Sequence, residues 1–186
     1  MWRYFLPAAL FLALGLVLGY TLTRIDRGKL DVREIQSPLL GKPAPAFNLP
    51  SLADPAQTVD SHSLAGKPYV FNVWGTWCGG CREEHAALIA IARTGGVSIV
   101  GLDWKDDRAL ALQWLEQLGN PYLTVASDPE GRIAIDWGVY GAPETFLVSA
   151  SGVVVAKHIG PLSQDVWRQK FVPRLGAAAA GDGGGS

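Results

Sequence analysis

The chain has 186 residues and only two cysteines, Cys78 and Cys81, which form a Cys-x-x-Cys pair. An apolar run of strand-forming residues, 69–74, precedes them, and a segment with helical periodicity follows them. The unpaired N–H groups and the dipole at a helix N-terminus favour a thiolate over a thiol. We therefore interpret the pair as a redox dithiol, in which Cys78 attacks a target disulfide and Cys81 resolves the mixed disulfide.

Two other uses of a cysteine pair compete with this interpretation. A zinc site needs about four ligands, and the three histidines, His62, His85 and His158, are scattered along the chain without a paired spacing. A structural disulfide would close a very short loop, for which the gain in loop entropy is small. We therefore expect a redox pair, with no metal site and no cofactor.

The segments around the dithiol predict an α/β domain. A parallel β-α-β unit is expected from a strand at 69–74, a helix at 78–93 that stops at Gly95-Gly96, and a strand at 97–102. A short edge strand at 47–49 and a hairpin within 51–68 precede this unit. The elements expected after it are a helix from Asp106 or Asp107 to Leu118, a strand at 121–125, a brief helix at 133–137, a hairpin of 144–148 with 153–155, and a last helix at 164–175.

The two ends of the chain differ from this domain. Residues 1–23 contain an uncharged run from Phe5 to Leu22, which has about the minimum length that spans a bilayer. Because the run is long and lacks a good cleavage site, we predict one uncleaved membrane anchor rather than a signal peptide. Residues 24–40 are predicted to be a tether, 41–175 the folded domain, and 176–186 a disordered tail rich in Ala and Gly.

Charge and size narrow the range of functions. The formal net charge is −1, and the sequence has neither a basic stripe nor a nucleic-acid-binding motif, so we expect no nucleic-acid partner. About 150 residues remain without the anchor, which is enough for one well-packed core.

Four segments are similar to a known family. Residues 74–85 (WGTWCGGCREEH) and 138–146 (GVYGAPETF) resemble the membrane-anchored thiol:disulfide interchange proteins of cytochrome c maturation, the CcmG/DsbE type, and residues 102–107 and 41–47 match that group too. The resemblance covers roughly residues 41–175. It implies a thioredoxin-like three-layer α/β sandwich with an N-terminal β extension, preceded by one transmembrane helix.

The resemblance also implies a function. Proteins of this type act on the periplasmic side of the bacterial inner membrane and help reduce the disulfide of apocytochrome c before haem is attached. Its implied partners are therefore apocytochrome c, or another thiol protein of cytochrome c maturation, and a membrane electron donor of the DsbD/CcdA kind. The positive charges beside the apolar run lean slightly against export, but we still expect a periplasmic domain because the N-terminal segment is very short and the domain carries a redox motif. A broader extracytoplasmic reductase or a peroxide-defence protein of related fold is the alternative, and a non-enzymatic module that holds apocytochrome or haem is a third.

Individual residues receive roles from the same resemblance. Cys78 matches the attacking cysteine, Cys81 the resolving one, and Pro143 the proline that follows a cis peptide bond and faces the dithiol. Glu84 lies one helical turn beyond Cys81 and could accept its proton if burial raised the pKa of the carboxyl group. Asn72 occupies the place of a buried aspartate in thioredoxin, which makes Glu84 the better candidate base.

The remaining expectations concern the surface around the dithiol. Trp77 is predicted to shield it, the backbone of Ala142 to pair with a substrate peptide, and Glu144 to lie near the same surface and bias the choice of partner by its charge. One departure from the family is the pair Gly79-Gly80, where most relatives carry proline at the first position. Two glycines loosen the start of the helix, so the reduction potential cannot be read from the family pattern.

Overall fold

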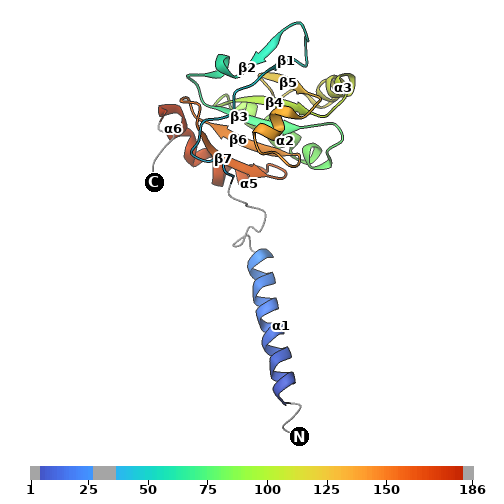
Figure 1. The fold of residues 1–186 in the computed structure, drawn as a ribbon, viewed down its shortest axis with the longest axis vertical. Coiled ribbons are helices and arrows are strands. Elements are labelled where there is room, and N and C mark those ends of the chain that lie inside the picture. Colours follow the sequence, from blue (N-terminus) through green and yellow to red (C-terminus); the bar gives the residue numbers. More distant parts are fainter. Residues whose placement is uncertain (1–4, 27–36, 182–186) are drawn as a thin grey trace. The chain divides into compact units, whose positions relative to one another are not determined.

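A mixed sheet of five strands, in the order β5-β4-β3-β6-β7, forms the centre of the domain (Figure 1). The structure is a computed structural model that describes residues 5–26 and 37–181. All six residues of the middle strand β3 (Tyr69–Trp74) are buried, as expected for an apolar run covered on both faces. β3 pairs in parallel with β4 (Ser98–Trp104) and antiparallel with β6 (Glu144–Val148), so the predicted β-α-β unit is confirmed.

The outer strands complete the sheet. β5 (Thr124–Asp128) runs parallel to β4, and β7 (Val154–Ile159) runs antiparallel to β6. β1 (Asn48–Pro50) and β2 (Thr58–Asp60) form a separate antiparallel pair, which is the predicted N-terminal β extension.

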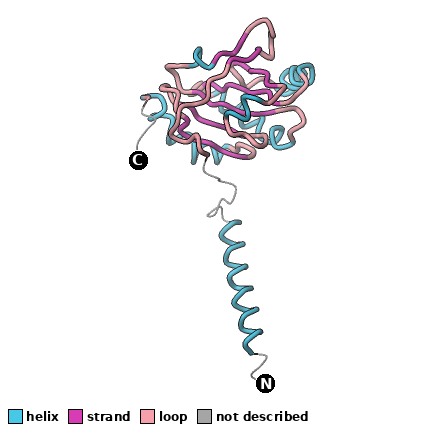
Figure 2. The backbone as a smooth tube through the Cα atoms, in the orientation of Figure 1, coloured by secondary structure: helices cyan, strands magenta, loops and turns pink. Residues whose placement is uncertain are grey.

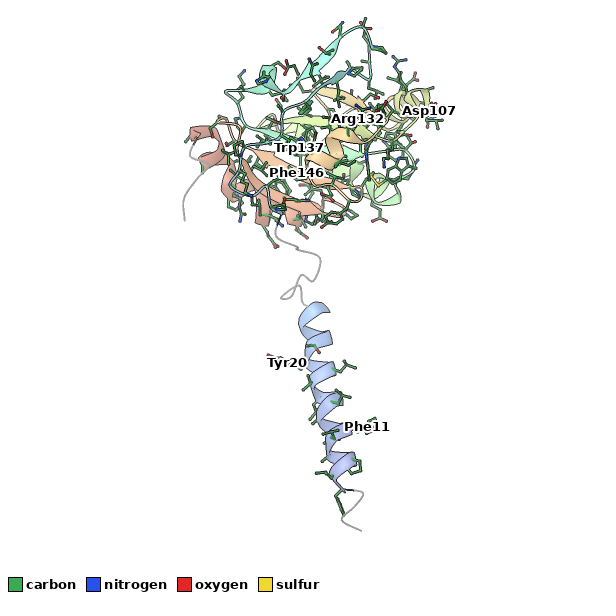
Figure 3. All side chains as sticks on the ribbon, viewed as in Figure 1. Phe11, Tyr20, Asp107, Arg132, Trp137 and Phe146 are labelled. Atoms are coloured by element: carbon green, nitrogen blue, oxygen red, sulfur yellow. A yellow bond between two sulfur atoms is a disulfide. The ribbon has the colours of Figure 1, made fainter. Side chains whose placement is uncertain are left out.

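Helices and loops cover the two faces of the sheet, and Figure 2 shows the strands inside them. The helical elements of the domain are α2 (Gly79–Arg93), α3 (Arg108–Leu118), α4 (Arg132–Asp136), α5 (Gln164–Val166), a π-helical turn η3 (Trp167–Phe171), α6 (Val172–Ala180) and the short 3-10 turn η2 (Ser61–Leu64). One core cluster contains Leu88, Trp114 and Phe171 from α2, α3 and η3. The other contains Trp137 and Phe146, which are labelled in Figure 3, so the three-layer α/β architecture is confirmed.

Several boundaries differ from the sequence-based predictions by a few residues, and two of the differences have a clear local cause. β5 begins at Thr124 rather than 121, because the side chain of Asn120 accepts the N–H of Tyr122 (2.9 Å) and forms a turn there. The predicted tail was wrong for residues 176–180, which continue α6. Alanines are strong helix formers, and Pro173 lies in the first turn of α6, where its missing N–H costs little. Residues 182–186 lie outside the described residues.

At the N-terminal end, α1 (Phe5–Asp26) forms a unit separate from the domain. In Figure 3 the side chains of Phe11 and Tyr20 project from it. Within the part of the chain that the structure describes, no helix combines the length and the apolar character needed to cross a membrane. Of the predicted tether, residues 27–36 lie outside the described residues, and Ser37 to Leu40 form a turn closed by a 3.1 Å hydrogen bond.

Candidate active site

The dithiol lies where β3 passes into α2. Cys78 is the N-cap of α2, with an extended backbone, and its Sγ accepts the N–H of Cys81 at 3.0 Å. The two cysteines form a disulfide with their α-carbons 5.3 Å apart, and they are 5% and 2% exposed. The predicted strand-to-helix junction is therefore confirmed. In the reduced protein, the same N–H would stabilise a thiolate on Cys78.

Pro143 packs against the dithiol turn. The Ala142–Pro143 peptide bond is cis, as predicted. A Cβ added to Gly80 would lie 3.0 Å from Cδ of Pro143 and 3.2 Å from Cγ of Pro161, whereas one added to Gly79 would meet nothing within 4 Å. A side chain at position 80 would therefore be crowded by the two prolines, whereas position 79 has room for one.

Trp77 is the most exposed side chain of the dithiol turn. It is 53% exposed, and its indole N–H donates to the carbonyl oxygen of Trp104 at 3.1 Å. The two rings meet edge to face, with their centroids 5.5 Å apart. About half of the Trp77 side chain is therefore exposed, while its indole N–H is held by Trp104.

Glu84 is buried one turn beyond Cys81 on α2, with 1% of its surface exposed. Its Oε1 accepts a hydrogen bond from the Asn72 amide (2.8 Å), and its Oε2 accepts one from the backbone N–H of Leu162 (2.7 Å). Burial raises the pKa of Glu84 to about 7, although both hydrogen bonds act in the opposite direction. A carboxyl group with this pKa can hold or release a proton at neutral pH.

Asn72 connects Glu84 to two further side chains. Its Oδ1 accepts the hydroxyl of Tyr122 at 2.9 Å, and its Nδ2 also donates to Oγ1 of Thr145 at 3.1 Å. Burial raises the pKa of the Tyr122 hydroxyl, and the negative charge of Glu84 adds to this effect. Asn72 is fully buried, as predicted, and its amide is held by partners on three sides.

Glu144 does not lie on the surface, so the structure corrects that expectation. It is 0% exposed, and its Oε2 lies 2.7 Å from Nζ of Lys157, a lysine whose side chain is 5% exposed. The other carboxyl oxygen accepts the N–H of Tyr140 at 3.2 Å, and Lys157 also donates to the carbonyl of Gly138 at 3.1 Å. The pair neutralises the charge of Glu144 and fastens the segment that leads to Pro143.

We expect Lys157→Met to lower the free energy of unfolding by about 3–5 kcal/mol, because it leaves the Glu144 carboxylate buried without its partner. Urea unfolding of the oxidised protein measures this loss. The double variant Lys157→Met, Glu144→Gln removes both charges and should recover most of it. Equal losses in the single and double variants would show that the packing of Lys157, rather than charge pairing, stabilises the segment.

Sequence reasoning did not single out Lys157, and it treated Asp103 and Asp106 only as parts of a family match or a helix cap. Two sequence patterns indicate a buried charge. One is the lysine that directly follows the apolar run 153–156, and the other is the aspartate that directly follows the predicted strand 97–102. The partners cannot be detected in this way, because they lie on other elements. Among the described residues, no group of three or more His, Cys, Asp or Glu side chains is placed to hold a metal ion.

Comparison with known proteins supports the same chemistry. Residues 39–171 match the Redoxin family. The chain is 47% identical to the thiol:disulfide interchange protein DsbE of Allochromatium vinosum over 92% of this chain and 91% of the relative. It is 42% identical to the protein of the same name from Escherichia coli K12, with 90% of each chain covered. A thiol:disulfide interchange protein of the thioredoxin family from Chlorobium tepidum has a crystal structure that covers 74% of this chain and 95% of its own, with a TM-score of 0.60 and 28% identity.

These matches, together with a Cys78–Cys81 disulfide at the start of α2 and a thioredoxin-like sheet, make the protein a thiol:disulfide oxidoreductase. The chain belongs to the DsbE-type thiol:disulfide interchange proteins of the Redoxin family.

Proposed function

We propose that this protein is a membrane-anchored dithiol reductant that acts on apocytochrome c, or on a thiol protein of cytochrome c maturation, at the periplasmic face of the inner membrane. The observation that carries the proposal is the dithiol turn packed against the Ala142–Pro143 segment, in a chain that shares 42–47% identity with DsbE proteins over nine-tenths of its length. Both family segments, 74–85 and 138–146, meet at this point.

In the proposed reaction the Cys78 thiolate attacks one sulfur of the target disulfide, and the other target sulfur leaves as a thiolate. The Cys81 thiolate then attacks Sγ of Cys78, releases the target's second thiolate and forms the Cys78–Cys81 disulfide. The target gains two electrons and the protein loses two. Glu84, with its pKa of about 7, is our candidate acceptor for the Cys81 proton.

The target is proposed to dock as an extended peptide. Ala142 precedes the cis peptide bond, and its backbone groups are our candidates for strand-like pairing with the residues that flank the target cysteines. Trp77, half exposed beside the dithiol, would cover the mixed disulfide. Glu144 is excluded from direct electrostatic recognition by its burial and its pairing with Lys157, and we assign it to holding the segment in place.

The proposed location and electron supply follow from the redox chemistry. In an oxidising compartment a dithiol stays reduced only if an electron donor continually reduces the disulfide that forms from it. We therefore propose a membrane donor of the DsbD/CcdA kind. The uncharged run from Phe5 to Leu22 supports a membrane anchor. Fractionation tests this part: the full chain should sediment with membranes and a chain without residues 1–23 should not.

A deletion strain tests the proposed substrate. Without this protein, haem-stained holocytochrome c should be lost; wild type should restore it and a Cys78→Ser variant should not. Purified protein should also reduce a disulfide peptide with the sequence Cys-x-x-Cys-His about tenfold faster than insulin, a discrimination of about 1.4 kcal/mol. Normal holocytochrome c in the deletion strain, with equal rates on unrelated disulfides, would instead favour a general extracytoplasmic reductase.

A further inference from the structure

The turn that leads into Cys78 is held by the loop that follows β4. This turn, residues 75–77, contains no regular secondary structure, although it determines where the N-cap cysteine lies. Only one hydrogen bond within the turn reaches Cys78, from its N–H to the carbonyl oxygen of Gly75 at 3.1 Å. The position of the turn therefore depends on contacts from outside it.

Asp106 provides the largest part of these contacts. Its Oδ2 accepts the backbone N–H of Thr76, and its Oδ1 accepts the hydroxyl of the same residue at 2.7 Å. Oδ1 also accepts the N–H of Asp107 at 2.8 Å, which fixes the orientation of the carboxyl group from its own side. The Asp106 side chain thus accepts hydrogen bonds from both the backbone and the side chain of Thr76, two positions before Cys78.

Trp104, the last residue of β4, completes the contact. Its carbonyl oxygen accepts the indole N–H of Trp77, so Thr76 and Trp77 are both bound. Gly75 allows Trp77 and Trp104 to approach this closely, because a Cβ at position 75 would lie 2.6 Å from Nε1 of Trp77 and 3.2 Å from the carbonyl oxygen of Trp104. We call the contact of 75–77 with Trp104 and Asp106 the β4 clamp.

We propose that Asp106 is a positioning residue for thiol–disulfide exchange: it holds the turn that places Cys78 within reach of Cys81 and thereby sets the stability of the disulfide. The residue does not touch the sulfur atoms and acts through Thr76. The proposal concerns the exchange activity itself and does not depend on which protein is the substrate.

The direction of the effect follows from two consequences of removing the Asp106 side chain. A looser turn lowers the effective concentration of one thiol at the other, which weakens the disulfide relative to the dithiol. Loss of a negative charge near the helix start also favours the thiolate, and therefore the reduced form. Both consequences make the reduction potential less negative.

Asp107 offers a matched control. It is the neighbouring aspartate and carries the same charge, but its Oδ1 accepts the N–H groups of Ala109 and Leu110 as the N-cap of α3. None of its described hydrogen bonds reaches the turn at 75–77. Asp107→Ala should therefore lower thermal stability through the lost cap and shift the potential by clearly less than Asp106→Ala, since it removes a charge without loosening the turn.

The experiment is to equilibrate the full chain, in detergent, with glutathione buffers and to measure the fraction oxidised. For Asp106→Ala we expect the equilibrium constant for disulfide formation to fall about tenfold, which corresponds to about 30 mV. Thr76→Val keeps the charge of Asp106 and removes one clamp hydrogen bond, so it should shift the potential in the same direction by a smaller amount. Thermal unfolding of each oxidised variant is recorded in parallel.

The proposal is overturned by an unchanged potential in Asp106→Ala, or by an equal shift in Asp107→Ala. A shift in Asp106→Ala with none in Thr76→Val also overturns it, because the effect would then be one of charge rather than of position. If Asp106→Ala does not fold, Thr76→Val decides alone, and an unchanged potential in that variant rejects the positioning role.

Discussion

Cys78→Ser is expected to reduce the rate of disulfide exchange by on the order of a thousandfold or more, the scale of loss when an activated nucleophile is removed. Cys78 is the N-cap of α2, and its sulfur already accepts the N–H of Cys81, so the thiolate that attacks a target is best stabilised at this position. A serine hydroxyl at the same place is not ionised at neutral pH and cannot form the mixed disulfide.

Cys81→Ser separates the roles of the two cysteines. This variant keeps the attacking thiol and lacks the resolving one, so it should accumulate a covalent adduct with a disulfide peptide, which mass spectrometry detects. Cys78→Ser should accumulate none. The opposite result, with an adduct only in Cys78→Ser, would mean that Cys81 attacks first and that the N-cap hydrogen bond does not select the nucleophile.

Much of this site could be predicted because its pattern is local. The apolar strand, the Cys-x-x-Cys pair and the glycines that end α2 lie within one stretch, and their periodicity specifies the β-α-β unit. The cis bond before Pro143 was predicted from the family segment, and the structure confirms it. Each of these features is determined by residues that are adjacent in the sequence, or it belongs to one contiguous family segment.

The features that were missed depend on pairs of residues far apart in the sequence. Glu144 was expected near the substrate-facing surface because it follows Pro143, but it is buried and paired with Lys157 on the next strand. The cap of α3 was predicted to be Asp106 or Asp107, and Asp107 is the cap; the bond of Asp106 to Thr76 on another element was not predicted. Neither pairing could be predicted from the sequence, because the residues around a charged side chain do not show which distant residue it contacts.

Asp103→Asn is expected to change the pH dependence of stability more than any other single substitution in the domain. Asp103 lies on β4, it is 1% exposed, and among the described residues its carboxyl group faces that of Asp106 and no cation. Burial, followed by the negative charge of Asp106, raises its pKa from 3.8 to about 8. The folded protein therefore keeps this proton over a pH range in which the unfolded chain has already released it.

The sign of the effect follows from proton binding. Between pH 4 and 8 the folded state binds more protons than the unfolded state, so stability falls as the pH rises through this window and levels off above it. Asparagine keeps the shape of the side chain and has no proton to lose. We expect Asp103→Asn to match wild type near pH 4 and to exceed it by up to about 5 kcal/mol above pH 8.

Urea unfolding of the oxidised protein at pH 4 to 9 measures the free energy of unfolding as a function of pH. Two further variants are measured in the same way. Glu84→Gln should remove a similar decline between pH 4.5 and 7, because burial raises the pKa of Glu84 from 4.5 to about 7. Glu116→Gln replaces an exposed carboxylate on α3 and is the control for removing one acidic side chain. A curve for Asp103→Asn that runs parallel to wild type at every pH would mean that Asp103 is ionised in the folded protein, and its burial would then have to be offset by a partner bound at the end of β4.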